Sequence, residues 1–348
     1  MSNVITEAQI ADEIREFNER NGRPPTLREW KVEYKHSDSR CAQYGGYAAV
    51  RERALGSDFI APELHDRDIP IDTLIDERIR RYEQYWKYES ARRLVQIKVN
   101  VTGPIAIVHF GDPHLDDDGT DLARLKRDLE IVDQTPFMYA ANVGDVTNNW
   151  VGRLAKQWAM QSTTEFDAWR LAEWMFDACR WLYVVAGNHD LWASNGKILD
   201  WVASTASTVH HRTQVRIALQ FPNGREVRIN ARHDFPGSSI WNPAHGPMKA
   251  AQMGWRDHVL TCGHKHKSGY GPIKDPMTGM ISHAIQVPSY KFLDDYAARK
   301  GFPDQMLAPC CTTIIDPDAE EETGLVLVDW DLERAACMLG ALRSWKKS

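Results

Sequence analysis

The sequence predicts an α/β fold preceded by a small all-helical domain. From about Val99 onward, short apolar runs alternate with amphipathic stretches, which is typical of strands and helices that share one core. Residues 6–55, by contrast, show only the spacing of amphipathic helices. A chain of 348 residues is long enough for two domains, because single cores usually stop growing near about 250 to 300 residues.

The N-terminal residues read as a compact helical module. Ile10, Ile14 and Phe17 lie on one face at helical spacing. Thr26 followed by Glu29 forms a capping-box pattern, which predicts that a second helix begins there. The later stretch YAAVRERAL is also amphipathic and predicts a third helix.

The chain is expected to divide into three parts. Residues 1–56 form the helical module, 57–98 form a linker and an amphipathic helical arm, and 99–348 form the main domain. Two prolines and mixed charge mark the linker, and the helical pattern of the arm continues to about Gln96. The arm is rich in aromatic and charged residues, so it either packs internally or joins two copies in a homo-oligomer.

Five apolar runs in the main domain predict strands, and polar pairs follow each of them directly. The runs are IAIVHF, FMYAANV, WLYVVA, VRINAR and HVLTC, and the pairs are GD, GD, GN, HD and GH. Asn223-Gly224 predicts a hairpin with a tight primed turn. The stretch QWAMQSTTEFDAWRLAEWMFDACRW is strongly helical in pattern, and the tail segments GLVLVDWD and RAACMLGALRS are expected to add strands.

Composition narrows the class of protein. The net charge of -6 argues against nonspecific binding of nucleic acid over the whole protein surface. The six cysteines are scattered and do not form a dense disulfide framework. No stretch approaches the roughly 18 apolar residues of a membrane span, and the first residues do not resemble a signal peptide. We therefore expect a cytoplasmic protein with reduced thiols and no membrane partner.

Candidate metal ligands gather at the predicted strand ends. In an open α/β sheet, ligands bind beyond the carboxyl ends of strands, where glycine lets the backbone turn sharply. Carboxylate, amide and imidazole groups together suit Mn, Fe, Zn or Ni better than Ca or Mg, and the lack of thiolates argues against a closed structural zinc site. The seven candidates are Asp112, His114, Asp145, Asn188, His233, His264 and His266.

The ordered motifs DxH, GD, GNHD, His and GHxH, over about residues 105–267, resemble those of the calcineurin-like metallophosphoesterases. The resemblance implies a four-layer sandwich of two mixed sheets flanked by helices, with two divalent metal ions at the strand ends. Manganese is the favoured ion, with Fe, Zn, Ni and Mg as alternatives. By the same resemblance, one ion is held by Asp112, His114 and His266, the other by Asn188, His233 and His264, and Asp145 bridges them.

The resemblance also implies a mechanism. A hydroxide formed on the two ions attacks phosphorus in line, and His189 protonates the leaving oxygen. Asp190 is expected to orient His189, since a neighbouring carboxylate raises the pKa of an imidazolium. His245 is an alternative to His233 as the seventh ligand, although only His233 directly ends a predicted strand.

One departure from the family bears on the substrate. After Asp145 the chain reads VTNNW, without the Asp-Arg-Gly continuation of the protein serine/threonine phosphatases. The missing arginine would have clamped a monoester dianion, so a diester is the expected substrate.

The N-terminal module resembles a helix-turn-helix repeat that accompanies homing-type endonucleases, in RPPTLREW and more loosely in YGGYAAVRERAL. The resemblance implies DNA binding; interleaved acidic residues leave a purely structural or protein-contact role open. The candidate DNA-binding residues are Arg28, Lys31, Lys35, Arg40 and Arg51.

Together these features predict a two-metal-dependent phosphodiesterase that acts as a DNA nuclease. A small-molecule phosphoesterase, acting on cyclic nucleotides or monoesters, is one alternative. A nucleic-acid-binding protein with a vestigial metal site is the other.

Overall fold

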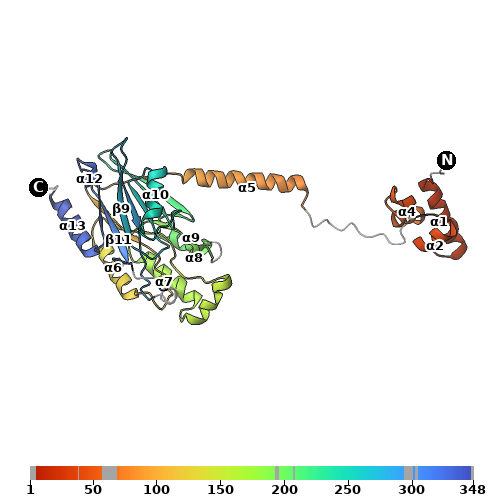
Figure 1. Ribbon diagram of the computed structural model, residues 1–348, viewed down its shortest axis with the longest axis horizontal. Helices are drawn as coiled ribbons and strands as arrows, with labels where there is room; N and C mark the ends of the chain where they lie inside the picture. Colours follow the sequence, from red (N-terminus) through yellow and green to blue (C-terminus); the bar gives the residue numbers. More distant parts are fainter. Residues whose placement is uncertain are drawn as a thin grey trace. The chain divides into compact units, whose positions relative to one another are not determined.

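The computed structural model describes residues 5–37, 39–56, 69–192, 196–206, 208–293, 301 and 305–345. The chain divides into two compact units, Met1–Arg80 and Arg81–Ser348, and each is treated by itself (Figure 1). The boundary between them falls within helix α5, Ile71–Ala91. Most of the predicted linker, residues 57–68, lies outside the described residues.

Unit 1 begins with a bundle of short helices around one small core. Thr6 and Thr26 both form capping boxes, the second as the sequence predicted. Trp30 is fully buried, and its indole nitrogen donates to Glu13 at 2.9 Å. The helices are α1 (Glu7–Asn21), α2 (Leu27–Glu33), α3 (Ser39–Ala42) and α4 (Tyr47–Leu55).

Unit 2 contains two six-stranded sheets, with strand orders β1-β6-β7-β8-β10-β9 in sheet A and β12-β11-β2-β3-β4-β5 in sheet B. Both sheets mix parallel and antiparallel pairs. Sheet A consists of β1 (Val95–Lys98), β6 (Gln214–Gln220), β7 (Glu226–Arg232), β8 (Val259–Cys262), β9 (Gly269–Lys274) and β10 (Ile281–Gln286). Sheet B consists of β2 (Ile105–Phe110), β3 (Met138–Asn142), β4 (Trp181–Val185), β5 (Val209–His211), β11 (Cys310–Ile315) and β12 (Val326–Asp329).

The two sheets pack face to face, and helices cover their outer faces. Ile107 and Val185 of sheet B meet Ile217 and Ile229 of sheet A in one apolar cluster. A second cluster joins the other face of sheet B to its helices, and a third joins α10 to sheet A (Figure 1). The remaining helical elements are α6 (Leu122–Gln134), the 3-10 element η1 (Gly152–Met160), α7 (Glu165–Asp177), α8 (Asn188–Trp192), α9 (Lys197–Thr205), α10 (His245–Met253), α12 (Glu322–Leu325) and α13 (Leu332–Trp345).

This architecture confirms the predicted α/β fold of two mixed sheets flanked by helices, with a helical N-terminal segment. Strand β2 is buried along its whole length because both of its faces are covered. Among the described residues, no helix is both long and apolar enough to cross a membrane.

The predicted end of the helical arm was wrong. The helical arm does not continue to Gln96: helix α5 ends at Ala91, and β1 then pairs in parallel with β6. Val95 and Ile97 alternate with exposed residues and pack on the core between the sheets, which favours a strand.

The stretch predicted to be helical after Trp150 forms two elements. Thr164 caps α7 by accepting from the backbone of Asp167, so a new helix begins there and η1 stands apart from it. The segment RAACMLGALRS was expected to be a strand but forms α13. Leu332, Ala335 and Leu339 are buried at helical spacing and explain the difference.

The predicted hairpin exists, but its turn is not a primed one. The backbone N–H of Gly224 donates to Phe221, so Pro222 and Asn223 are the central residues. Proline fixes φ near about -65°, whereas a primed turn needs a positive φ at that position. Gly224 instead takes the left-handed conformation, with φ of 84°.

Candidate metal centre

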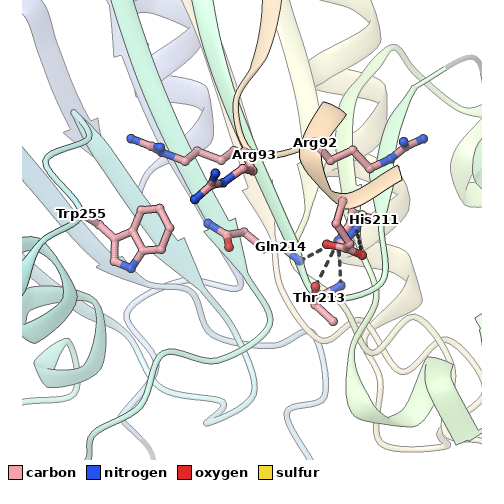
Figure 2. Close-up of a pocket in the computed structure, with 8 residues that line it drawn as sticks. Arg92, Arg93, His211, Thr213, Gln214 and Trp255 are labelled. Carbon is pink, nitrogen blue, oxygen red and sulfur yellow. Dashed lines mark hydrogen bonds and ion pairs between the residues drawn. The ribbon is translucent and has the colours of Figure 1, made fainter. Parts of the chain in front are cut away.

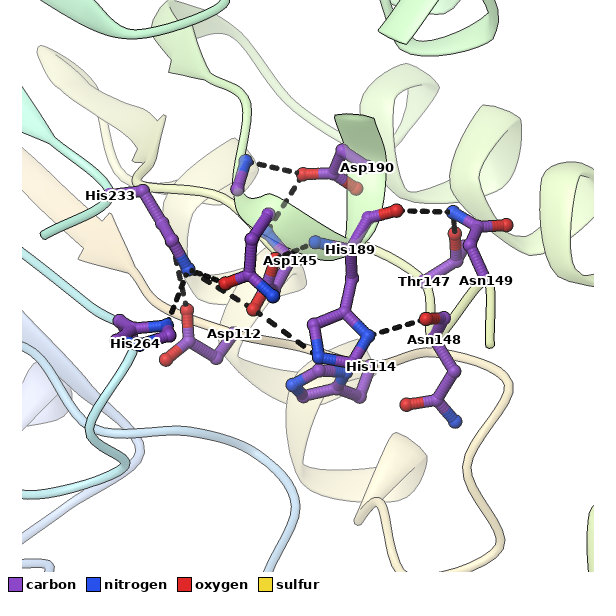
Figure 3. A network of polar contacts seen from close by, with 12 residues as sticks. Asp112, His114, Asp145, Thr147, Asn148, Asn149, His189, Asp190, His233 and His264 are labelled. Atoms are coloured by element: carbon purple, nitrogen blue, oxygen red, sulfur yellow. Dashed lines mark hydrogen bonds and ion pairs between the residues drawn. The ribbon is translucent and has the colours of Figure 1, made fainter. Parts of the chain in front are cut away.

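All seven predicted ligands lie at one edge of the two sheets (Figure 3 shows most of them). Strands β2, β3 and β4 are parallel neighbours, as are β7 and β8, so their carboxyl ends meet at the same edges. His233 follows the last residue of β7 directly, and His264 lies two residues beyond β8. Strand direction therefore brings together residues that are far apart in the sequence.

His233 is the centre of the first group of ligands. Its Nε2 lies 3.0 Å from the side-chain oxygen of Asn188 and 3.0 Å from Nδ1 of His264. The Oδ2 of Asp145 is 3.1 Å from the same nitrogen. These four side chains converge on one point, so they offer one amide oxygen, one carboxylate oxygen and two imidazole nitrogens to a single ion.

The second group contains the other three candidates. The Nε2 atoms of His114 and His266 are 3.2 Å apart, and that of His266 is 3.5 Å from Oδ2 of Asp112. Asp145 lies close to both groups, because its carboxylate oxygens come within 4.8 Å of ring nitrogens of His114 on one side and His233 on the other. A carboxylate in that position can serve two ions at once.

His245, the alternative ligand, begins α10 instead. Its ring lies beside Gly237, where a methyl group in place of the glycine hydrogen would come 3.1 Å from the ring carbon Cδ2. Neither candidate ligand cluster among the described residues includes it.

Asp112 shows that this residue set fits a cation. Its carboxylate is fully buried, and both oxygens lack a hydrogen-bond partner within the described part of the chain, as does Nδ1 of His114. Burying a carboxylate that accepts no hydrogen bond costs several kcal/mol, more than burying a neutral polar group. A divalent ion would satisfy these atoms, and the oxygen and imidazole donors suit a transition metal.

Burial and neighbouring charges shift the pKa values of the candidate ligands. Burial raises the pKa of Asp112 well above its usual range. Burial opposes ionisation of His233 too, but the Asp145 carboxylate beside it raises the pKa of His233 to about 10. Without an ion, an imidazolium therefore supplies the positive charge that the carboxylates require, and metal binding must release that proton.

The backbone of the site is strained. Asp112, His114, Asp145, His264 and His266 have φ values of 42°, 41°, 54°, 71° and 49°, in the left-handed region that non-glycine residues avoid. Each such residue costs of the order of 1 to 3 kcal/mol, and such residues cluster at functional sites. The strain is consistent with a backbone shaped for ligand geometry.

The glycines before the ligands have a packing reason. A methyl group on Gly187 would lie 2.1 Å from Oδ1 of Asp145, and one on Gly263 would lie 2.6 Å from Oδ1 of Asp112. Only glycine leaves room for these carboxylates to reach the centre.

His189 points its ring into the site, but Asp190 does not orient it. The Nδ1 of His189 contacts the backbone carbonyl of Asn148, while Nε2 lies 4.0 Å from Oδ2 of Asp145 (Figure 3). The ring also packs on Trp192, with the centroids 4.2 Å apart. The expected contact from Asp190 is replaced by a backbone carbonyl.

Asp190 is instead bonded to the backbone of neighbouring loops. Its carboxylate accepts from the N–H groups of Asp145, Val146 and Gly187 at 2.8, 3.0 and 2.8 Å. Burial, followed by the nearby Asp145, raises the pKa of Asp190 to about 7. These bonds tie the loop after β3 to the loop after β4.

A polar network behind His189 was not predicted from the sequence. Asn148 donates from its side chain to Asp117 and Gln161, and its backbone N–H donates to Asp116 at 2.8 Å. Gln161 also accepts from the indole of Trp150. The signal that could have revealed it is VTNNW, where two asparagines and a tryptophan stand in place of the missing arginine.

Comparison with known proteins gives limited likeness. No protein-family model matches the chain, and no curated protein does. Vps29 from Chaetomium thermophilum is 12% identical, covering 65% of this chain and 95% of its own, with a TM-score of 0.32. A conserved uncharacterized protein from Streptococcus pneumoniae TIGR4, described as a predicted phosphoesterase, is 11% identical, covering 66% and 100%, with a TM-score of 0.30. The protein of unknown function AQ665 from Aquifex aeolicus is 15% identical, covering 47% and 80%, with a TM-score of 0.26.

Similarity at these levels does not indicate an activity for this chain. The functional assignment rests on the side chains of the site itself.

Proposed function

We propose that unit 2 is a metal-dependent phosphodiesterase that hydrolyses DNA. The observation that carries the proposal is the carboxylate of Asp145, which lies between two groups of metal-ligand side chains. Beside it lies Asp112, whose buried oxygens have no hydrogen-bond partner among the described residues. Asp112, His114 and His266 would hold one ion, Asn188, His233 and His264 the other, and Asp145 both. When bound, such a pair of ions neutralises phosphoryl oxygens and lowers the pKa of water.

His189 supplies the proton for the leaving oxygen. A carbonyl oxygen only accepts hydrogen bonds, so the contact with Asn148 requires the proton of a neutral ring to sit on Nδ1. When the ring is protonated, Nε2 is then the nitrogen with a proton to give. The packing of Trp192 on the ring restricts its rotation, which keeps Nε2 on the side of Asp145.

Two further features support a DNA diester. The segment after Asp145 supplies asparagines and a tryptophan instead of the arginine that suits a monoester dianion. In unit 1, Glu29 and Glu33 pair with Arg23 and Arg20, so these acidic groups are already neutralised. Three of the predicted DNA-binding residues are exposed cations: Arg28, Lys35 and Arg51.

The test is turnover on a substrate panel with Mn²⁺, Fe²⁺, Zn²⁺, Ni²⁺ or Mg²⁺. The panel contains single- and double-stranded DNA, bis-nitrophenyl phosphate, nitrophenyl phosphate and cyclic nucleotides. We expect DNA and the small diester to be cleaved. Turnover confined to small esters would overturn the DNA proposal, and DNA binding without any turnover would indicate a vestigial metal site.

Matched variants test the roles of the residues. Asp145→Asn and His233→Gln should lower the metal content below two ions per chain, whereas His245→Gln should bind metal normally. A normal metal content in His233→Gln with a loss in His245→Gln would reverse the assignment. His189→Gln should retain metal but lose about 10² to 10⁴ in kcat on DNA, with a smaller loss on nitrophenyl leaving groups.

A further inference from the structure

A cavity of about 270 Å³ lies in unit 2, at the start of strand β6 (Figure 2). Its walls come from the end of α5 and the residues after it, from β5 and β6 with their connection, and from the segment between α10 and β8. We call it the arginine pocket. It is lined by Glu89, Arg92, Arg93, His211, Thr213, Gln214, Arg216 and Trp255.

Strand register places the arginine pocket next to the ligand-bearing loops. Gln214 pairs directly with Arg232 on the neighbouring strand, and the candidate ligand His233 is the next residue. On the other side, the carbonyl of His211 accepts from Ala186, two residues before Asn188. The backbone of Gln214 therefore lies about one strand spacing of about 4.8 Å and one residue rise of about 3.3 Å from that of His233. Their side chains leave opposite faces of sheet A, because Val215 and Ala231 pack between the two sheets and His233 contacts the carbonyl of Val143. A strand bound at the metal centre would reach the pocket across the end of sheet A.

The floor of the pocket is rigid. Arg216 forms two hydrogen bonds of 2.8 Å with the fully buried Asp257. Trp255 lies beside the guanidinium groups of Arg216 and Arg232, whose central carbons are 5.0 and 5.2 Å from its ring. Arg232 also donates to Gln214 at 2.6 Å, and its Nε is buried without a hydrogen-bond partner among the described residues.

Two arginines at the rim of the arginine pocket carry positive charge that no ion pair among the described residues neutralises. The central guanidinium carbon of Arg92 lies 3.7 Å from the ring centroid of Tyr88, and its Nη1 donates to the backbone carbonyl of Tyr88 at 3.4 Å, which leaves its other N–H groups for a ligand. Arg93 is exposed. In the described part of the chain, neither arginine forms an ion pair, and the one lining carboxylate, Glu89, lies 3.4 Å from His211. The pocket thus offers two available arginines to an anion.

We propose that the arginine pocket binds a phosphate group of the same strand whose scissile phosphate is at the metal centre. This inference rests on the proposed phosphodiesterase function and specifies its substrate as a chain with several phosphates. Arginine binds phosphate with paired N–H donors, and every nucleotide in a strand carries one negative charge. Trp255 adds a flat apolar surface beside that phosphate, suited to a base.

Kinetics on long and short substrates test the proposal. Arg93→Gln and Arg92→Gln should each lower kcat/KM on an oligonucleotide by about tenfold at low salt, as expected for one charge-assisted hydrogen bond. Each should also reduce the salt dependence of binding by about 0.7 logarithmic units per decade. Turnover of bis-nitrophenyl phosphate should not change, because it has no second phosphate. Lys126→Gln, an exposed charge on α6, is the control for the loss of one cation.

Equal losses on both substrates, or no loss on the oligonucleotide, would overturn the proposal. Arg93→Lys should restore most of the salt dependence but less of the affinity, since lysine lacks the paired donors.

Binding without metal separates this proposal from the proposed function. Calorimetry in chelator would compare a four-nucleotide oligothymidylate with inorganic phosphate, for wild type and for Arg93→Gln. Tighter binding of the oligonucleotide, lost in the variant, supports a strand phosphate. If DNA is never cleaved but phosphate binds and is lost in Arg93→Gln, the nuclease function fails and the pocket is a site for free phosphate. If neither probe distinguishes the variant from wild type, the pocket proposal is wrong.

Discussion

The carboxylate of Asp190 provides the sharpest test of the site, because its bonds differ from those the sequence suggested. Its two oxygens accept from three backbone N–H groups, two at Oδ2 and one at Oδ1. Asp190→Ala leaves all three donors buried without an acceptor. Each unsatisfied group costs about 1 to 3 kcal/mol, so the total loss should be at least about 3 kcal/mol.

Asp190→Asn should cost less. The amide oxygen can keep the two bonds made by Oδ2, while its NH₂ group faces the remaining N–H. One lost bond corresponds to about 2 kcal/mol, or roughly 4 to 8 °C in Tm for a unit of this size. Asp177→Asn, on the exposed end of α7, is the matched control and should change stability by less than about 0.5 kcal/mol.

The assay is thermal and urea unfolding at pH 8 in chelator. At that pH most of the Asp190 carboxylate is ionised, since burial raises its pKa only to about 7, and the chelator removes effects of metal occupancy. If Asp190→Ala melts within about 1 °C of wild type, the reasoning from backbone bonds is wrong. A different result would be that Asp190→Ala keeps normal stability and metal content but loses activity on DNA more than on nitrophenyl esters, as predicted for His189→Gln. That result would show that Asp190 orients His189.

Three other predictions address packing and pH. Gly187→Ala should lower metal affinity at least about tenfold, because its methyl group would lie 2.1 Å from Oδ1 of Asp145; metal titration checks this, and Gly340→Ala, with nothing within 4 Å, should be neutral. Burial lowers the pKa of His109 to about 3. Below about pH 6.5 the unfolded state therefore binds a proton at His109 that the folded state does not bind. His109 alone should therefore make stability fall by about 1.4 kcal/mol per pH unit between about pH 6.5 and 3, so the slope should be smaller by about that amount in His109→Gln, and equal slopes in urea unfolding would contradict this. Trp30→Ala should cost unit 1 about 3 to 5 kcal/mol and abolish hydrogen-exchange protection in α1 and α2; unchanged protection would show that this core does not depend on the indole.

Local patterns in the sequence predicted the α/β class of unit 2 and the candidate ligands, and the family resemblance implied the two mixed sheets. An apolar run followed by glycine and a polar residue needs no tertiary information to be recognised, because strand burial and the turn at its end are both local requirements. The capping box at Thr26 is local in the same sense. Two predictions that failed were also local: Pro222 decided the type of the hairpin turn, and apolar residues at helical spacing made the segment RAACMLGALRS a helix.

What only the tertiary structure decided is which atoms face one another across the site. Adjacency in the motif GNHD suggested that Asp190 serves His189, yet the turn of α8 directs its carboxylate to the backbone of Asp145 and Gly187. The arginine pocket has no sequence signature at all, since Arg93, Gln214 and Trp255 meet only through the pairing of β6 with β1 and β7. Sequence spacing determines direction along one element, whereas contacts between elements depend on strand register and helix orientation, which arise from packing of the whole core.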